Sequence, residues 1–140
     1  MTPEICTVKH DPANGTYGDC VRACVASILD LDSDAVPHFF HDDAPDPIPQ
    51  QRMVEYLAPM GFAPFTAHYP GALTRDDLLT MMGQLNPDVH YMLFRRLANG
   101  GDHVVVCKGD QVVHDPAWFA VPLVDGGSNG YWSIMVIARA

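Results

Sequence analysis

The amino-acid sequence changes character near residue 90, from apolar residues at helical spacing to short runs rich in valine, isoleucine and aromatic residues. These runs are separated by turn clusters of glycine, asparagine and aspartate, a pattern typical of β-strands joined by tight turns. They predict strands at Tyr91 to Leu97, His103 to Lys108, Gln111 to His114 and Trp132 to Ala138. Helices followed by antiparallel strands predict an α+β fold in which a helix packs on a twisted sheet.

The most strongly marked helix begins after Asp19, a residue type that is favoured as an N-cap. From Cys20 to Leu29 apolar residues recur at helical spacing, and no glycine or proline interrupts the pattern before Pro37. We expect all of these apolar residues to face the interior, which would make this helix the central one of the fold.

Further helical patterns lie between the first helix and the β-rich part of the chain. They predict a short helical turn around Ser33 to Phe40 and helices at Pro49 to Pro59 and Arg75 to Gln84. The helix from Pro49 is expected to bury Met53, Val54 and Leu57. The third helix is opened by a capping-box pair, Thr74 and Asp77.

Length and charge limit the classes of protein to which the chain can belong. Its 140 residues are the size of one compact domain, so we predict a single domain over residues 1–140. Eight lysines and arginines against 17 aspartates and glutamates give a net charge of −9, which disfavours nucleic acid or anionic lipid as a partner. No stretch approaches the ~18 apolar residues of a membrane span, and the first residues lack the pattern of a secretory signal. We therefore expect a cytoplasmic protein whose four cysteines are reduced.

Cys20 occupies the first turn of the predicted central helix. Backbone N–H groups without an intrahelical partner, together with the helix dipole, favour an anion there, so the thiolate of Cys20 should be stabilised. The thiolate is the nucleophilic form of cysteine, and the same N–H groups can stabilise the oxyanion of a tetrahedral intermediate. Because Asp19 and the net charge of −9 oppose ionisation, we expect that a histidine partner is required.

His103 is the best placed of the seven histidines to be that partner. It begins a predicted strand after the loop at residues 99–102, so its ring would project from a rigid sheet edge. A hairpin that turns at Gly109-Asp110 would bring Asp115 opposite His103, where a carboxylate can hold the imidazole tautomer and stabilise its protonated form. The spacing therefore predicts a nucleophile, base and acid formed by Cys20, His103 and Asp115.

Three local sequence strings carry a resemblance to a known family. They are Gly18-Asp19-Cys20-Val21-Arg22-Ala23-Cys24, then His103-Val104-Val105-Val106, then Val112-Val113-His114-Asp115-Pro116-Ala117. In this order they resemble the papain-like cysteine peptidases, closest to the bacteriocin-processing (double-glycine leader) peptidase domains of export transporters. The resemblance covers Asn14 to Ala117. It implies a papain-like fold, with an N-terminal nucleophile helix packed on a C-terminal antiparallel sheet.

The resemblance also implies a role for each site residue. Cys20 matches the family's nucleophile, His103 its base and Asp115 its orienting acid. The family's oxyanion-hole glutamine precedes its cysteine by six residues, which is the place of Asn14 here. Asn14 keeps the amide donor but is one methylene shorter, so the N–H of Cys20 would have to complete the hole. Val21 replaces the small residue that usually follows the family's cysteine, and this departure would narrow access.

Four further residues are expected to border the substrate. They are Tyr17, Gly18, Asp102 and Trp118. For the aromatic ones, packing in the core or at its rim is the alternative. The loops at residues 42–50, 67–73 and 125–130 are expected to form subsites, and loops carry no readable code for the substrate.

Taken together, the residues predict a cysteine hydrolase, a peptidase or isopeptidase that cleaves an amide bond of a peptide or protein through a thioester. No cofactor is needed for this chemistry, and the oligomeric state is not predicted. Two alternatives stay open: a Cys-dependent acyltransferase, and a catalytically inactive papain-like binding or inhibitor protein. A zinc site from Cys20, Cys24, His103 and Cys107 is disfavoured, because four residues along a strand span roughly 13 Å, too far for two bonds of about 2.0 to 2.3 Å.

Overall fold

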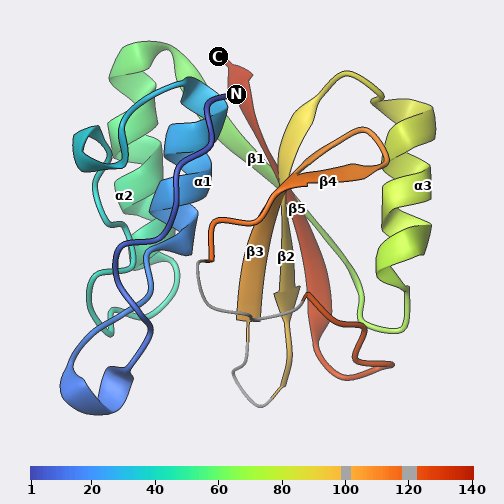
Figure 1. Ribbon diagram of the computed structural model, residues 1–140, viewed down its shortest axis with the longest axis horizontal. Helices are drawn as coiled ribbons and strands as arrows, with labels where there is room; N and C mark the ends of the chain where they lie inside the picture. Colours follow the sequence, from blue (N-terminus) through green and yellow to red (C-terminus); the bar gives the residue numbers. More distant parts are fainter. Residues whose placement is uncertain (99–101, 118–122) are drawn as a thin grey trace. The chain divides into compact units, whose positions relative to one another are not determined.

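The structure is a computed structural model that describes residues 1–98, 102–117 and 123–140, and of Asp102 only the backbone. The described residues contain three α-helices and a five-stranded sheet (Figure 1). Those within Met1–Pro64, Pro116–Trp118 and Ile137–Ala140 form one compact unit, unit 1, and those within Phe65–Asp115 and Phe119–Val136 form unit 2. Within the described residues, no helix combines the length and the apolar character needed to cross a membrane.

Unit 1 holds two α-helices, α1 (Cys20–Leu29) and α2 (Ile48–Leu57). Its short 3-10 helices are η1 (Pro12–Asn14), η2 (Ser33–Ala35) and η3 (Ala58–Met60). The N-terminal segment runs beside α1 in Figure 1, and the Thr2 N–H donates to the Ser27 carbonyl oxygen at 3.0 Å. The buried apolar side chains of unit 1 are Cys6, Ala23, Cys24, Val25, Ala26, Val36, Phe39, Met53 and Leu57.

Helix α1 begins and ends where the sequence predicts, but its burial differs from the prediction. The buried residues form one continuous run from Ala23 to Ser27. Five consecutive residues exceed one turn of 3.6, so the middle of the helix is enclosed on every side. Val21, Ile28 and Leu29, nearer its ends, are only half-buried, and the expectation that all its apolar residues face the interior is wrong.

Helix α2 buries a narrower stripe than expected. Pro49, Met53 and Leu57 are buried, and their spacing of four residues puts them on one face. Val54 lies next to Met53 in the chain and so turns away from that face, leaving it 47% exposed. The prediction that Val54 is buried is therefore wrong. The helical turn expected around Ser33 to Phe40 is confined to the three residues of η2.

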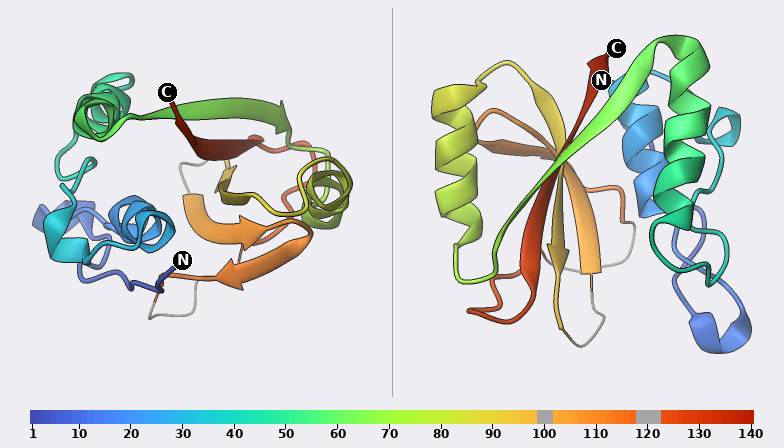
Figure 2. Two further views of the ribbon diagram at one scale, coloured as in Figure 1. Left: turned by 90° about the horizontal axis from the view of Figure 1, so that it is seen from above. Right: turned by 180° about the vertical axis from the view of Figure 1, so that it is seen from behind.

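Most of unit 2 is a sheet covered on one side by α3 (Arg75–Leu85). The strands are β1 (Phe62–Pro70), β2 (His90–Arg96), β3 (Asp102–Lys108), β4 (Gln111–His114) and β5 (Tyr131–Arg139), in the order β1-β5-β2-β3-β4. Strand β2 pairs antiparallel with β3 and with β5, which confirms the predicted α+β class. Figure 2 shows a curved sheet with α3 on its concave side. The core between them consists of Leu78, Leu79, Met82, Tyr91, Leu93, Val105, Cys107, Leu123, Trp132 and Ile134.

Helix α3 carries the predicted capping box. The Thr74 hydroxyl accepts from the Asp77 N–H at 3.1 Å, and the Asp77 carboxylate accepts from the Thr74 N–H at 3.0 Å. Each residue therefore satisfies a backbone donor at the start of the helix, which is why a two-residue signal located this element correctly.

Strand β1 was not predicted from the sequence. It contains Pro64 and Pro70, and its central residues 65–68 are all exposed, so it shows no alternation of buried and exposed side chains. Proline cannot donate to a sheet ladder and is tolerated on edge strands, and β1 lies at the edge of the sheet.

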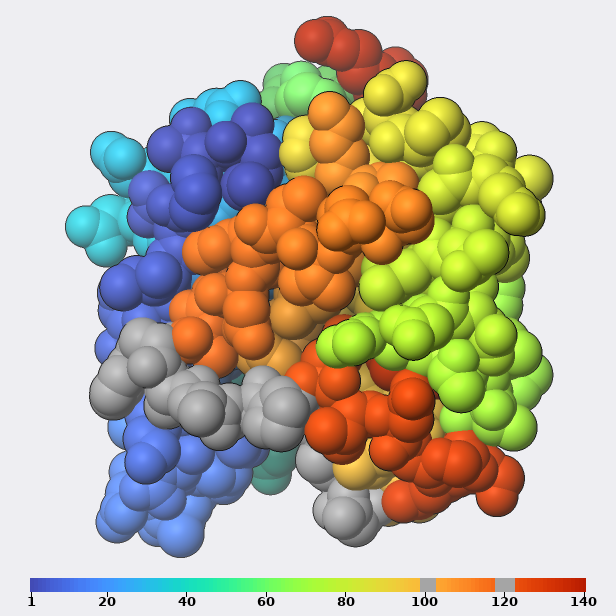
Figure 3. Space-filling model, turned by 45° about the vertical axis from the view of Figure 1, so that its right-hand side comes forward, coloured from blue at the N-terminus to red at the C-terminus, as the bar shows by residue number. Residues whose placement is uncertain are grey.

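The hairpin of β3 and β4 turns where predicted but pairs in a different register. Lys108 faces Gln111 and Cys107 faces Val112, whereas Val106 faces His114, so Val113 is an extra residue that forms a bulge. The predicted pairing of residues 103 and 115 is therefore wrong. Strand β4 is the other edge of the sheet, and its outward side chains form part of the surface in Figure 3.

Candidate functional site

The clearest polar pair at the predicted site is His103 and Asp115. Nε2 of His103 lies 2.9 Å from Oδ1 of Asp115, a hydrogen-bonding distance. The His103 side chain is 6% exposed and that of Asp115 is 43% exposed, so a buried ring is held by a carboxylate at the surface. His103 belongs to β3, which lies between β2 and β4 in the sheet.

The β3–β4 bulge explains how these two residues meet although they are not paired. Continuing the observed register past Val106 and His114 would put Asp115 opposite Val105, two residues from His103 on the same face. Diagonal neighbours of this kind are within reach of long polar side chains. The sequence thus predicted the right partners from an incorrect register.

The bond to Asp115 defines the chemistry available to His103. A carboxylate that accepts from Nε2–H selects the tautomer in which Nδ1 carries the lone pair. The same carboxylate stabilises the ring when Nδ1 takes up a proton. His103 is therefore held in the form that a general base requires.

Cys20 is the first residue of α1 in unit 1 and is half-buried. The first bond of the helix runs from the Ala23 N–H to the Asp19 carbonyl oxygen at 3.0 Å, so the N–H groups of residues 20–22 precede the helical ladder. The Asp19 side chain, predicted to cap the helix, makes no cap hydrogen bond. The Asp19 carboxylate therefore does not cap the start of α1, and a helix start favours an anion.

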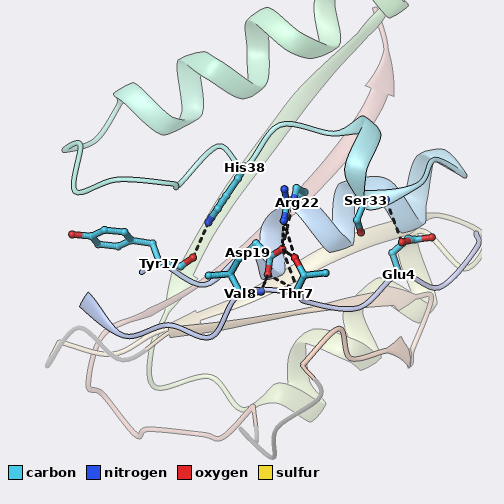
Figure 4. Close-up of polar contacts among 8 residues, drawn as sticks. All are labelled: Glu4, Thr7, Val8, Tyr17, Asp19, Arg22, Ser33 and His38. Carbon is cyan, nitrogen blue, oxygen red and sulfur yellow. Dashed lines mark hydrogen bonds and ion pairs between the residues drawn. The ribbon is translucent and has the colours of Figure 1, made fainter. Parts of the chain in front are cut away.

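The Asp19 carboxylate instead binds the N-terminal segment and Arg22 (Figure 4). It accepts from the backbone N–H groups of Thr7 and Val8, both at 3.0 Å, and from the Thr7 hydroxyl at 2.9 Å. Nε and Nη2 of Arg22 donate to the same carboxylate. Burial alone would raise the pKa of Asp19, but these hydrogen bonds outweigh it and hold the pKa below its usual value.

A second thiol lies beside Cys20. Cys6 is 2% exposed. The neighbouring Cys20 thiol and burial raise the pKa of Cys6 far above its usual value, so Cys6 stays protonated at neutral pH. No local pattern predicts that residues 6 and 20 are neighbours, because they meet only in the folded chain.

Two histidines hold the loop that precedes Cys20, a role the sequence analysis missed. Nε2 of His38 lies 2.7 Å from the Tyr17 carbonyl oxygen (Figure 4), and the Gly18 N–H donates to Nδ1 of His10 at 3.2 Å. Burial lowers the pKa of His38, so the ring is neutral at neutral pH. The two histidine side chains therefore hold the backbones of Tyr17 and Gly18, which are predicted to border the substrate.

The remaining predicted site residues are placed as follows. Asn14 is exposed in η1, and its amide donates to the Asp11 carboxylate at 2.6 Å. Asp102 begins β3, but its side chain lies outside the description, and Trp118 and the loop at residues 99–101 lie outside the described residues altogether. No group of three or more histidine, cysteine or acidic side chains in the described part of the chain is arranged to hold a metal ion.

Comparison of the chain with known proteins found no matching family model, no similar curated protein and no similar solved structure.

Proposed function

We propose that the chain is a papain-like cysteine hydrolase that cleaves an amide or isopeptide bond of a peptide or protein. The observation that carries this proposal is the 2.9 Å bond between His103 Nε2 and the Asp115 carboxylate. A buried imidazole oriented by an acid is the machinery of a general base, and Cys20 at a helix start is the matching nucleophile.

The proposed reaction uses residues of the chain alone. Nδ1 of His103 takes the proton of the Cys20 thiol, and the sulfur attacks the carbonyl carbon of the substrate. The N–H groups at the start of α1 stabilise the resulting oxyanion. Its collapse breaks the C–N bond, and His103 donates its proton to the leaving amine. Water, deprotonated by His103, then hydrolyses the thioester to a carboxylic acid and the free thiol.

The position of Asn14 favours a second candidate function. The amide that the family resemblance assigns to the oxyanion hole is bonded to Asp11 in an exposed turn. If it does not turn toward the carbonyl oxygen, the transition state has one donor fewer, which typically costs about 10²- to 10³-fold in rate. The chain would then be a binding or inhibitor protein with a cysteine peptidase architecture.

The test is the pH dependence of alkylation of Cys20 by iodoacetamide. A free thiol of pKa ~8.5 is only about one-thousandth ionised at pH ~5.5, so fast reaction at that pH marks a thiolate paired with an imidazolium. Trypsin releases Cys20 in a peptide from His10 to Arg22 that contains no other cysteine, so mass spectrometry can follow it separately.

We expect fast alkylation of Cys20 at pH ~5.5, and its loss in His103→Ala. The matched control is His114→Ala, which removes the neighbouring sheet histidine that faces Val106 and should leave the rate unchanged. Equal rates for the wild type and His103→Ala at every pH would refute the hydrolase and favour the binding protein.

A further inference from the structure

The Asp19 carboxylate is bonded to Thr7, Val8 and Arg22, and the catalytic steps above do not use it. Asp19 is 1% exposed and directly precedes Cys20. An acid at this place would by itself oppose ionisation of the thiol. Arg22 offsets that charge by donating to the same carboxylate through Nε and Nη2.

The bonds of Asp19 dock the segment of residues 6–8 against the start of α1. Thr7 and Val8 donate backbone N–H groups to the carboxylate, and the Thr7 hydroxyl both donates to Asp19 and accepts from Arg22 Nη2 at 2.9 Å. Figure 4 shows these groups gathered around one carboxylate. Three donor groups of two consecutive residues therefore hold the segment to Asp19.

The docked segment makes two contacts that bear on the site. The buried Cys6 thiol lies beside the thiol of Cys20. The Cys6 backbone N–H donates to the Pro116 carbonyl oxygen at 2.8 Å, and Pro116 directly follows Asp115 in the chain. The segment therefore connects the start of α1 to Pro116 within unit 1.

We propose that Asp19 is a positioning residue for Cys20, and that its carboxylate fixes the start of α1 by docking residues 6–8 against it. The inference rests on the proposed function and assigns to Asp19 a part in it. The role is geometric. A charge effect has the opposite sign, because removing a carboxylate beside a thiol favours the thiolate.

The same N-terminal segment offers a matched control at the other end of α1. Asp30 accepts from the Thr2 hydroxyl at 2.8 Å and pairs with the N-terminal amine of Met1 at 3.2 Å. Asp30→Asn loosens this end of the same segment and leaves the Cys20 end intact. A general loss of N-terminal docking would affect both variants alike.

The experiment compares the rate of Cys20 alkylation by iodoacetamide at pH ~5.5 in the wild type, Asp19→Ala, Asp19→Asn and Asp30→Asn. Misplacing a reacting group by about 1 Å can cost 10²-fold, so we expect Asp19→Ala to react about 10- to 100-fold more slowly. Asp19→Asn keeps one acceptor oxygen for Thr7 and Val8, so its rate should lie between the two. Asp30→Asn should remain within about twofold of the wild type.

Thr7→Val keeps the test decisive if the Asp19 variants do not fold. It removes only the hydroxyl that bridges Asp19 and Arg22, and it should slow the reaction in the same direction by a smaller factor. Folding of each variant is checked by circular dichroism at the assay pH, since a purely structural role would lower the melting temperature and leave the rate of the folded protein unchanged.

Three outcomes separate the inference from the proposed function. Slow reaction of the wild type at pH ~5.5, or equal rates for the wild type and His103→Ala, refutes the hydrolase and the inference with it. Fast wild-type reaction with unchanged rates in Asp19→Asn and Thr7→Val refutes the inference alone. A faster reaction in Asp19→Ala shows that charge is what matters at Asp19, and also overturns it.

Discussion

Arg95 offers a sharp test of how the sheet carrying His103 is held together. It lies in β2 opposite His103 on β3 and Trp132 on β5, and it is 2% exposed. Nη1 donates to the Gly71 carbonyl oxygen at 3.2 Å, Nη2 donates to that of Asn129 at 2.7 Å, and the guanidinium carbon lies 4.7 Å from the centre of the Trp132 ring. A buried charge thus joins two loops without a carboxylate partner among the described residues.

The two substitutions Arg95→Met and Arg95→Lys separate the contribution of charge from that of shape. Methionine leaves two carbonyl oxygens unpaired, at ~1 kcal/mol each, and removes a cation–π contact of about 1 to 2 kcal/mol. This loss of stability is partly offset, because the variant no longer buries a charge. We expect Arg95→Met to lower the free energy of unfolding by about 1 to 3 kcal/mol. Lysine keeps a strongly hydrated charge buried but cannot span both carbonyls, so it should cost more, about 3 to 5 kcal/mol.

Urea unfolding followed by tryptophan fluorescence measures both values. A difference of 1 kcal/mol corresponds to a shift of about 2 to 4 °C in melting temperature for a chain of this size, so thermal unfolding is an independent check. Arg75→Lys is the control, because Arg75 is 44% exposed and its contact to Asp76 is 3.9 Å long. A lysine variant as stable as the wild type, or more stable than the methionine variant, would show that the forked geometry of Arg95 is unimportant.

Three further predictions follow from other contacts. Leu57→Ala should cost about 2 to 5 kcal/mol in the free energy of unfolding, since Leu57 is fully buried, whereas Val54→Ala on the same helix should stay within about 0.5 kcal/mol. The Arg52 guanidinium holds the pKa of Asp42 at about 2, so this pair should contribute stability above pH ~4 and lose it as the pH falls toward 2. Comparing urea midpoints of the wild type and Asp42→Asn across that range measures the contribution, and parallel pH profiles would contradict it. Asp115→Ala should slow Cys20 alkylation at pH ~5.5 by about 10- to 100-fold while changing the melting temperature little, and an unchanged rate would remove Asp115 from the site.

Elements with strong local signals were predicted correctly from the sequence. Helix α1 begins at Cys20 as the spacing predicts, because its apolar periodicity and the absence of helix breakers are encoded within ten residues. Helix α3 was located by Thr74 and Asp77, whose reciprocal bonds involve residues only three apart. In both cases the information that selects the structure is contained in the segment itself.

The features that the sequence did not predict depend on contacts between distant segments. Strand β1 has no pattern of its own and is a strand because β5 offers it a partner. The exposure of Val54 depends on which face of α2 the rest of unit 1 covers. The turn of this hairpin has a local signal, because Gly109 has a φ of 56° and a Cβ there would lie 2.7 Å from the Pro87 carbonyl oxygen. The bulge at Val113 lies beyond the turn and has no such signal in the sequence.

The same distinction applies to Asp19, for which the sequence predicts a capping role that the structure does not show. An aspartate before a helix is favoured as a cap, and propensity alone assigns its oxygen to the helix N–H groups. The folded chain offers it Thr7, Val8 and Arg22 instead, none of which a local pattern connects to it. If Asp19 capped α1, its carboxylate would occupy the N–H groups at the helix start that would otherwise stabilise a thiolate at Cys20.

A net charge of −9 opposes ionisation of a thiol in general, but the effect of each carboxylate depends on the group to which it is bonded. Of the acids named at the site, Asp19 is neutralised by Arg22 and directed away from the helix start, while Asp115 accepts from His103 and favours its protonated form. In the proposed reaction, protonated His103 is the counterion of the Cys20 thiolate. Negative charge on Asp115 would then promote ionisation of the thiol through the imidazole. The net charge of −9 is no guide to this chemistry, because what decides it is the group to which each carboxylate is bonded.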